Sequence, residues 1–167
     1  VPADVDATRY RSLPDLLEDS FRRYAERDAF VFMEHALTYA ELDRLSAAFG
    51  AWLQGTGLPR GARVALMMPN ILQYPVALAG ALRAGYVVVN VNPLYTPREL
   101  EHQLKDSGAS AIVILENFAS TLQQALTQVR VEHVITTQVG DLLPIPKRWL
   151  VNFVIKKVKK MVPAWKI

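Results

Sequence analysis

The chain contains no cysteine at any of its 167 positions. Disulfide bonds, thiolate nucleophiles and cysteine-ligated metal sites are therefore excluded, and the composition fits a reducing compartment. Long apolar runs are also missing, because no stretch approaches the roughly 18 apolar residues of a membrane-spanning helix. Residues 1–10 are polar and acidic, without the apolar core of a signal peptide. The chain starts at Val1 and not at methionine, so we expect a trimmed chain.

The sequence also has no phosphate-binding loop of the Walker type. Gly55, Gly57 and Gly61 come nearest, but they follow a predicted helix and lead into a predicted strand. A phosphate loop must leave a strand and open a helix, so that the helix N-terminus faces the anion. We therefore interpret this loop as a structural turn. No Gly-x-Ser-x-Gly sequence is present, which leaves a nucleophilic serine triad unsupported.

Metal-ligating side chains are few and scattered. His35, His102 and His133 lie on different predicted elements, and Glu99-x-x-His102 is half of a carboxylate–histidine pattern without a twin. We predict no metal site, no catalytic residue and no cofactor-binding residue in this chain. Three asparagines lie at or near strand ends, where open α/β sheets bind ligands. We favour turn and capping roles for the two that adjoin prolines; the three are Asn70, Asn90 and Asn92.

Short apolar runs recur about every 23 residues, each separated from the next by a helical pattern. They begin near residues 63, 86, 111 and 133. This alternation predicts an α/β fold with a doubly wound, mostly parallel sheet flanked by helices. The predicted helix at 72–84 is apolar on nearly every side and must be enclosed. Gly80 within it suggests close approach of a strand, because glycine is otherwise unfavourable in a helix.

Local signals mark several element boundaries. Ser12 with Asp15 predicts a helix start, and Thr38–Glu41 and Thr96–Glu99 predict capping boxes. A strand at 29–33 turns at residues 34–36 and pairs back through 37–39 as a hairpin. A later helix is expected to start at Asn117 or Ser120.

Charge is divided unevenly along the chain. Residues 1–141 hold 12 Lys/Arg and all 16 Asp/Glu, which gives −4. Residues 142–167 hold seven Lys/Arg and no acid, which gives +7. We therefore divide the chain into an α/β subdomain at 1–141 and a basic amphipathic segment at 142–167. A positive field confined to one end suggests an anionic partner there.

The basic segment predicts one amphipathic helix over residues 149–161. Its aliphatic side chains fall within roughly 140° of arc; they are Leu150, Val151, Val154, Ile155, Val158, Met161 and Val162. We favour contact with an anionic membrane surface, because aromatic rings among lysines suit the headgroup zone. The competing interpretation packs the stripe on the protein itself, and nucleic acid is disfavoured. The candidate membrane contacts are Lys147, Arg148, Trp149, Phe153, Lys156, Lys157, Lys159 and Lys160.

Three motifs carry a family resemblance. They are Met-Pro-Asn at 68–70, Ala-Leu-Arg-Ala-Gly at 81–85 and Asn-Val-Asn-Pro-Leu-Tyr-Thr-Pro-Arg-Glu-Leu at 90–100. They resemble the N-terminal region of AMP-forming acyl-CoA synthetases, most of all the bacterial long-chain fatty-acid–CoA ligases. The resemblance runs from about Arg11 to about Pro163 and implies the N-terminal subdomain of an adenylate-forming enzyme.

The resemblance implies an activity for the whole enzyme. Family members use ATP and magnesium to convert a long-chain fatty acid to an acyl-adenylate, and CoA then takes the acyl group. It also implies a cytoplasmic enzyme at the inner face of the membrane, with a homodimer as one option. The family's catalytic motifs are not among these residues and lie by resemblance beyond Ile167. We predict that the 167 residues alone bind no cofactor and are inactive. A stand-alone membrane-docking α/β module and a small nucleotide-binding domain are the competing classes.

Overall fold

A computed structural model of the chain describes residues 8–166; the start at Val1 and the last residue lie outside that range. The elements follow one another in a regular alternation. They are α1 (Leu13–Arg23), β1 (Asp28–Phe32), β2 (His35–Thr38), α2 (Tyr39–Gly55), β3 (Arg63–Met67), α3 (Gln73–Arg83), β4 (Val87–Asn90), α4 (Pro97–Ser107), β5 (Ala109–Leu115), η1 (Glu116–Phe118), α5 (Ala119–Ala125), β6 (His133–Thr137), α6 (Lys147–Phe153) and η2 (Val154–Val158).

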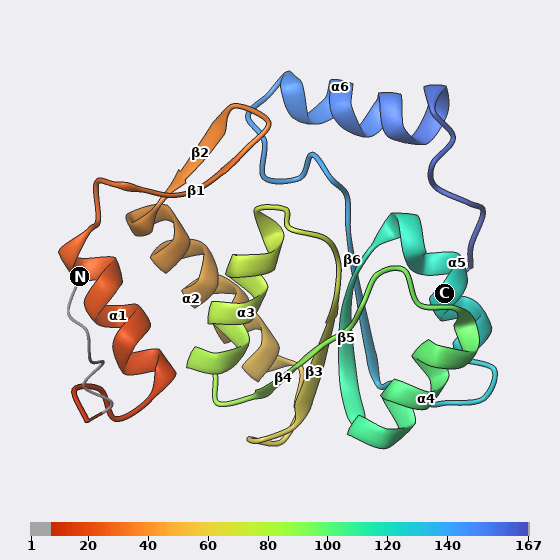
Figure 1. Ribbon diagram of the computed structural model, residues 1–167, viewed down its shortest axis with the longest axis horizontal. Coiled ribbons are helices and arrows are strands. Elements are labelled where there is room, and N and C mark those ends of the chain that lie inside the picture. The colour runs from red at the N-terminus through yellow and green to blue at the C-terminus, as the bar shows by residue number, and fades with distance from the viewer. Residues whose placement is uncertain (1–7, 167) are drawn as a thin grey trace, which may run out of the picture.

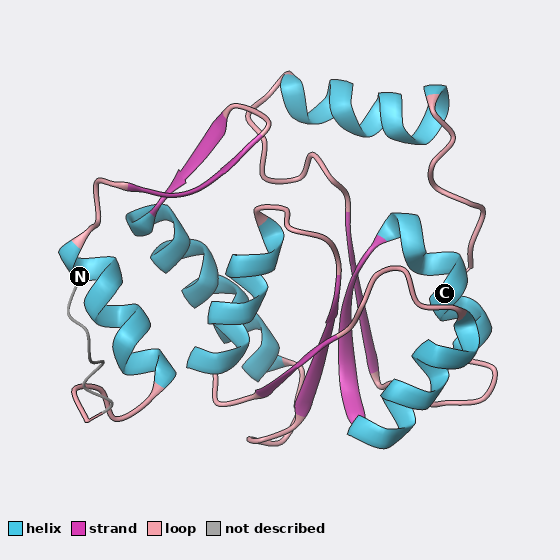
Figure 2. Ribbon diagram, viewed as in Figure 1, coloured by secondary structure: helices cyan, strands magenta, loops and turns pink. Residues whose placement is uncertain are grey.

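Four parallel strands form the central sheet in the order β4-β3-β5-β6 (Figures 1 and 2). They coincide with the four predicted apolar runs to within a few residues. The hairpin β1–β2 forms a separate antiparallel pair. Because all four strands of the sheet run the same way, their carboxyl ends meet at one edge.

Both faces of the sheet are covered. Along β3 the buried side chains alternate, with Val64 and Leu66 on one face and Ala65 and Met67 on the other. The first face packs on α2 and α3, and the second packs on α4 and α5; the helix residues concerned are Leu53, Ala77 and Ala81, and Leu100, Leu104 and Leu122. The prediction of a doubly wound α/β domain is confirmed; β3 and β5 are buried on both faces, whereas the edge strands β4 and β6 are only partly buried.

Helices α2 and α3 cross at a pair of glycines. A Cβ atom on Gly80 would lie 2.7 Å from the backbone oxygen of Ser46, and one on Gly50 would lie 2.8 Å from the oxygen of Gly80. The expectation that Gly80 faces a strand is therefore wrong: its close neighbour is a helix. A tight helix crossing needs small residues for the same reason that a close strand does, so the sequence could not tell the two apart.

Arg83 fastens this crossing. Its Nη1 donates to the backbone oxygen of Asp43 and to Ser46 Oγ, each at 2.9 Å, and pairs with the Asp43 carboxylate at 2.8 Å. Its guanidinium also stands 5.3 Å from the ring centroid of Phe21, on α1. One side chain thus joins three helices.

The hairpin turns at Met33 and Glu34, with φ of 48° and 61°. The predicted turn at 34–36 is wrong, since His35 and Ala36 already pair with β1. Two consecutive left-handed residues make a tight turn for which Asn-Gly is the usual sequence. A left-handed conformation costs about 1–2 kcal/mol for each residue with a side chain. Sequence missed the turn because neither residue is a typical turn former.

The predicted helix caps are confirmed. Ser12 Oγ accepts from the backbone N–H of Asp15, and Thr38 and Thr96 each form a complete capping box. The N–H of Thr38 donates to Glu41, and this hydrogen bond lowers the pKa of that carboxyl; Thr96 lowers the pKa of Glu99 in the same way. By contrast, α5 was expected to start at Asn117 or Ser120, and neither side chain caps it. The 3₁₀ turn η1 leads into the helix instead.

No helix within residues 8–166 is both long enough and apolar enough to cross a membrane.

The α2–α3 crossing generates a stability prediction. Gly80→Leu overpacks a contact that already excludes a methyl group, and we expect it to cost about 1–3 kcal/mol or more of folding free energy. Gly55→Ala is the matched control, because a Cβ there meets nothing within 4 Å. Chemical denaturation measures both. An unchanged midpoint for Gly80→Leu would contradict the tight crossing.

Candidate functional site

The basic segment lies across the carboxyl edge of the sheet. After β6 the chain leaves that edge, and α6 with η2 runs beyond it from the hairpin side toward α5 (Figure 1). Open α/β sheets place ligands outside the carboxyl ends of their strands. The segment therefore occupies the edge of this fold where function is most often found.

The predicted apolar stripe is divided between the protein and the solvent. Val151, Val154 and Ile155 are partly buried, and Val151 packs on the cluster that contains Leu143. Other apolar side chains of the segment are largely exposed: Ile145 (65%), Trp149 (66%), Leu150 (63%), Phe153 (58%), Val158 (62%) and Met161 (55%). The packing interpretation is thus correct for one side of the helix only.

A π-helical turn explains part of this division. The N–H of Lys159 donates to the oxygen of Val154 at 2.8 Å, five residues back, and Lys160 then has a left-handed φ of 50°. One extra residue in a turn rotates all later side chains by about 100° relative to an α-helix. The regular α-helix predicted to continue to Met161 is therefore wrong after Phe153, because residues 154–158 are π-helical and the helix ends at Val158.

Lys156 pairs with a buried carboxylate at the carboxyl edge, although its own side chain is 44% exposed. Its Nζ lies 3.1 Å from Oε2 of Glu116, whose side chain is only 6% exposed. Glu116 directly follows β5, so this pair ties η2 to the carboxyl edge. Removing one partner of a buried pair leaves the other charge uncompensated, which is strongly unfavourable.

Asp141 anchors the start of α6. Its Oδ2 accepts from Thr137 Oγ1 at 3.0 Å and from the N–H of Gln138 at 2.8 Å. Its Oδ1 accepts from Asn152 Nδ2 at 3.2 Å and lies 3.8 Å from the Arg148 guanidinium. The Arg148 side chain therefore faces this carboxylate while remaining partly exposed to solvent.

Lys147 joins α6 to the hairpin. Its Nζ donates to the backbone oxygen of Met33 and lies 3.6 Å from the Glu34 carboxylate. Sequence separated these groups by more than a hundred positions and gave no signal that they meet. The pairing neutralises the acidic residue at the hairpin turn.

The eight candidate contacts therefore fall into two groups. Three cations face carboxylates of the chain itself: Lys147, Arg148 and Lys156. The other five are exposed, and none of the lysines among them has an ion pair with any residue of 8–166; they are Trp149, Phe153, Lys157, Lys159 and Lys160. The second group presents both aromatic rings and free positive charge. Its contact with lipid stays a prediction.

Sequence reasoning missed the acidic partners. Glu116 ends an apolar run, Ala-Ile-Val-Ile-Leu-Glu, and a carboxylate there must be exposed or paired. That position was a usable signal for a cation nearby. It did not identify Lys156, which is 40 residues away.

Two of the three asparagines make side-chain hydrogen bonds, and the structure assigns no role to the third. Asn92 Oδ1 accepts from the N–H of Leu94 at 3.0 Å, which forms the expected turn. Asn90 Oδ1 accepts from Tyr74 Oη at 2.9 Å. Asn70 is exposed. Within residues 8–166, no group of three or more His, Asp or Glu side chains could hold a metal ion.

The chain matches known proteins along nearly all of its length. A family model described as "AMP-binding enzyme" matches residues 17–165. The long-chain-fatty-acid–CoA ligase of Escherichia coli O157:H7 is 58% identical over 166 residues, which is 99% of this chain and 30% of that protein. The ligase of the same name from Bacillus subtilis is 37% identical over 84% of this chain.

Solved structures agree with the fold. A benzoate CoA ligase from Burkholderia xenovorans superposes with a TM-score of 0.70 and 28% identity, over 75% of this chain and 25% of that one. MbtA from Mycobacterium smegmatis gives a TM-score of 0.66 at 35% identity. The chain spans about 30% of the length of the E. coli ligase that it matches. Since the family model covers most of the chain, the chain belongs to the AMP-binding enzyme family, whose adenylate-forming members share this N-terminal fold.

Proposed function

We propose that this chain is the N-terminal subdomain of an AMP-forming long-chain fatty-acid–CoA ligase. The observation that carries the proposal is 58% identity over 166 residues to a ligase of that name. Such an enzyme joins a fatty carboxylate to AMP with release of pyrophosphate, and the CoA thiol then displaces AMP. A carboxylate is a poor electrophile until a good leaving group replaces its charge, which is the reason for the adenylate.

We assign no chemical step to residues of this chain. Within residues 8–166 there is neither a phosphate loop that leaves a strand nor a cluster of three metal-ligating side chains. Gly57 and Gly61, with φ of 85° and 82°, form a turn between α2 and β3, at the opposite edge of the sheet from α6. By resemblance to the family, we propose that the sites for ATP, magnesium and CoA belong to the rest of the enzyme. Residues 1–141 serve as scaffold, and residues 142–167 lead toward that remainder.

We further propose that the exposed side of α6 and η2 contacts the anionic inner surface of the cytoplasmic membrane. Two terms support this. Burying apolar surface contributes about 25 cal/mol per Å². Each free lysine adds about 1 kcal/mol near an anionic surface. The absence of any acid in residues 142–167 leaves that attraction unopposed within the segment. A long-chain fatty acid partitions into membranes, so a docked enzyme meets its substrate there.

The activity proposal predicts that the 167 residues alone show no ATP–pyrophosphate exchange with fatty acids, whereas the full-length polypeptide does. Exchange by the purified short chain would contradict the scaffold role. The mass of the native protein is an independent check. A native protein of only 18.7 kDa would favour the stand-alone membrane module instead.

The membrane proposal predicts that Lys157, Lys159 and Lys160 dominate the electrostatic part of binding. Replacing all three by glutamine in the full-length polypeptide should weaken binding to anionic vesicles by roughly two orders of magnitude at low salt. Lys156 is left intact, because its loss would strand a buried carboxylate. Co-sedimentation with vesicles over a salt series measures the effect, which should shrink as salt rises.

Three exposed cations elsewhere provide the matched control for that experiment. Arg22, Arg44 and Arg130 lie on other parts of the surface, and replacing them by glutamine removes the same net charge. Their loss should leave vesicle binding nearly unchanged. Equal losses in the two triple variants would mean that net charge, and not this surface, attracts the protein.

A further inference from the structure

The tip of the hairpin is apolar where polar residues are usual. We define the β1–β2 tip as residues 30–34. It exposes three apolar side chains, Phe30 (45%), Val31 (67%) and Met33 (44%). Met33 occupies a left-handed position for which asparagine or glycine is preferred. A sequence that breaks a local rule without a local gain marks a place to look for function.

The tip and α6 lie on the same side of the molecule. Figure 1 shows the hairpin turn next to the start of α6, beyond the carboxyl edge of the sheet, and Lys147 joins the two. The apolar surface continues behind the tip as an open groove of about 370 Å³. Its lining comes from β1 and from the loop that leads into α3; the residues are Phe30, Val31, Phe32, Asn70, Ile71, Leu72, Tyr74 and Pro75.

The carboxylates nearest this face are compensated. Glu34 pairs with Lys147, Glu116 with Lys156, and Asp141 accepts hydrogen bonds from three groups. The remaining acid of the hairpin, Asp28, begins β1 at the end away from the turn. The exposed groups on this face are therefore apolar side chains at the hairpin tip and the unpaired lysines at the end of the basic segment, Lys157, Lys159 and Lys160. That combination fits an anionic lipid surface, whereas an acidic protein partner would leave the apolar tip without a role.

We propose that the β1–β2 tip enters the same anionic lipid surface as α6, with Lys147 holding the two elements in one face. This proposal rests on the proposed membrane contact of α6. It changes the role of Lys147, which the sequence suggested as a lipid contact: its ammonium group neutralises Glu34 and positions the hairpin. It also gives a reason for an exposed methionine in a strained turn.

A polar variant of the tip tests the proposal without endangering the fold. Val31→Thr keeps a β-branched residue in the strand, and Met33→Asn places a favoured residue in the left-handed turn. In the full-length protein, this double variant should bind vesicles of equal phosphatidylglycerol and phosphatidylcholine at least tenfold more weakly. The salt dependence should stay that of the parent, because no charge is changed. Thermal stability should be equal to or above that of the parent.

The matched control uses two other exposed apolar residues, Val87 at the start of the edge strand β4 and Leu13 at the start of α1. Val87→Thr with Leu13→Asn removes a comparable apolar surface and should leave vesicle binding unchanged.

The positioning role of Lys147 has its own signature. Lys157→Gln should weaken binding about fivefold, the effect of one surface lysine. Lys147→Gln should weaken it more, because Glu34 then faces the lipid unpaired. Glu34→Gln combined with Lys147→Gln should recover most of that loss. A merely structural lysine would show no such recovery.

The outcomes separate this inference from the proposed function. If the tip variant binds like the parent while the triple lysine variant does not, the tip proposal is wrong and the membrane contact of α6 stands. If neither variant changes binding, both are wrong.

If the tip variant instead alters the sedimentation coefficient, a second copy of the chain covers the tip. If the short chain binds vesicles and the full-length protein does not, the remainder of the polypeptide covers it. Either result overturns the tip proposal.

Discussion

The rest of the structure depends on the burial of β3 and β5 on both faces. Their side chains are almost fully enclosed on either side, so helices must cover both faces of the sheet. What remains accessible is the two edge strands, β4 and β6, and the ends of the strands. The carboxyl edge is the one that α6 crosses and the hairpin flanks (Figure 1), and three ion pairs link α6 and η2 to this edge and to the hairpin turn.

The packing of α2 on α3 also fixes the position of the hairpin. Gly50 and Gly80 bring the helices into backbone contact, and Arg83 joins them to α1. Because α2 begins at its cap Thr38, the last residue of β2, the hairpin is fixed by the same packing. Leu37 of β2 and Val151 of α6 also belong to one hydrophobic cluster. The two elements proposed to meet lipid are therefore attached to the same rigid layer.

Sequence predicted the sheet, its helices and most of their caps, because periodicity and capping residues are local signals. The strand at 111–115 and the box at Thr96–Glu99 needed nothing beyond their own neighbours. The errors arose where distant groups decide the outcome. The π turn after Phe153 is invisible to a helical wheel, and the partner of Lys156 is set by how the sheet brings Glu116 to its edge. Gly80 indicated that another element approaches closely, but the sequence did not show that this element is a helix. The turn at Met33 was missed because the sequence there is unfavourable for the conformation that it adopts.

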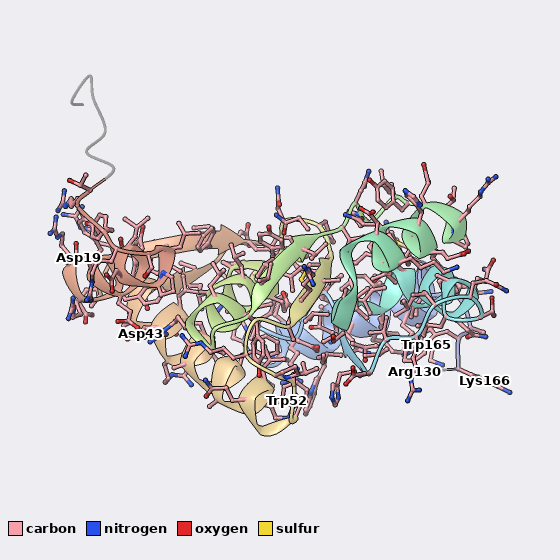
Figure 3. All side chains as sticks on the ribbon, turned by 90° about the horizontal axis from the view of Figure 1, so that it is seen from below. Asp19, Asp43, Trp52, Arg130, Trp165 and Lys166 are labelled. Atoms are coloured by element: carbon pink, nitrogen blue, oxygen red, sulfur yellow. The ribbon has the colours of Figure 1, made fainter. Side chains whose placement is uncertain are left out.

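The most direct test of the account asks which side of the molecule touches lipid. Trp149 lies on the exposed side of α6. Figure 3 labels the other two tryptophans, Trp52 on α2 and Trp165 near the chain end beside Lys166. Variants of the full-length protein that keep a single tryptophan can be mixed with anionic vesicles that contain brominated lipid, which quenches fluorescence on contact. The account predicts strong quenching of Trp149 and none of Trp52. Equal quenching of both, or quenching of Trp52 alone, would contradict it.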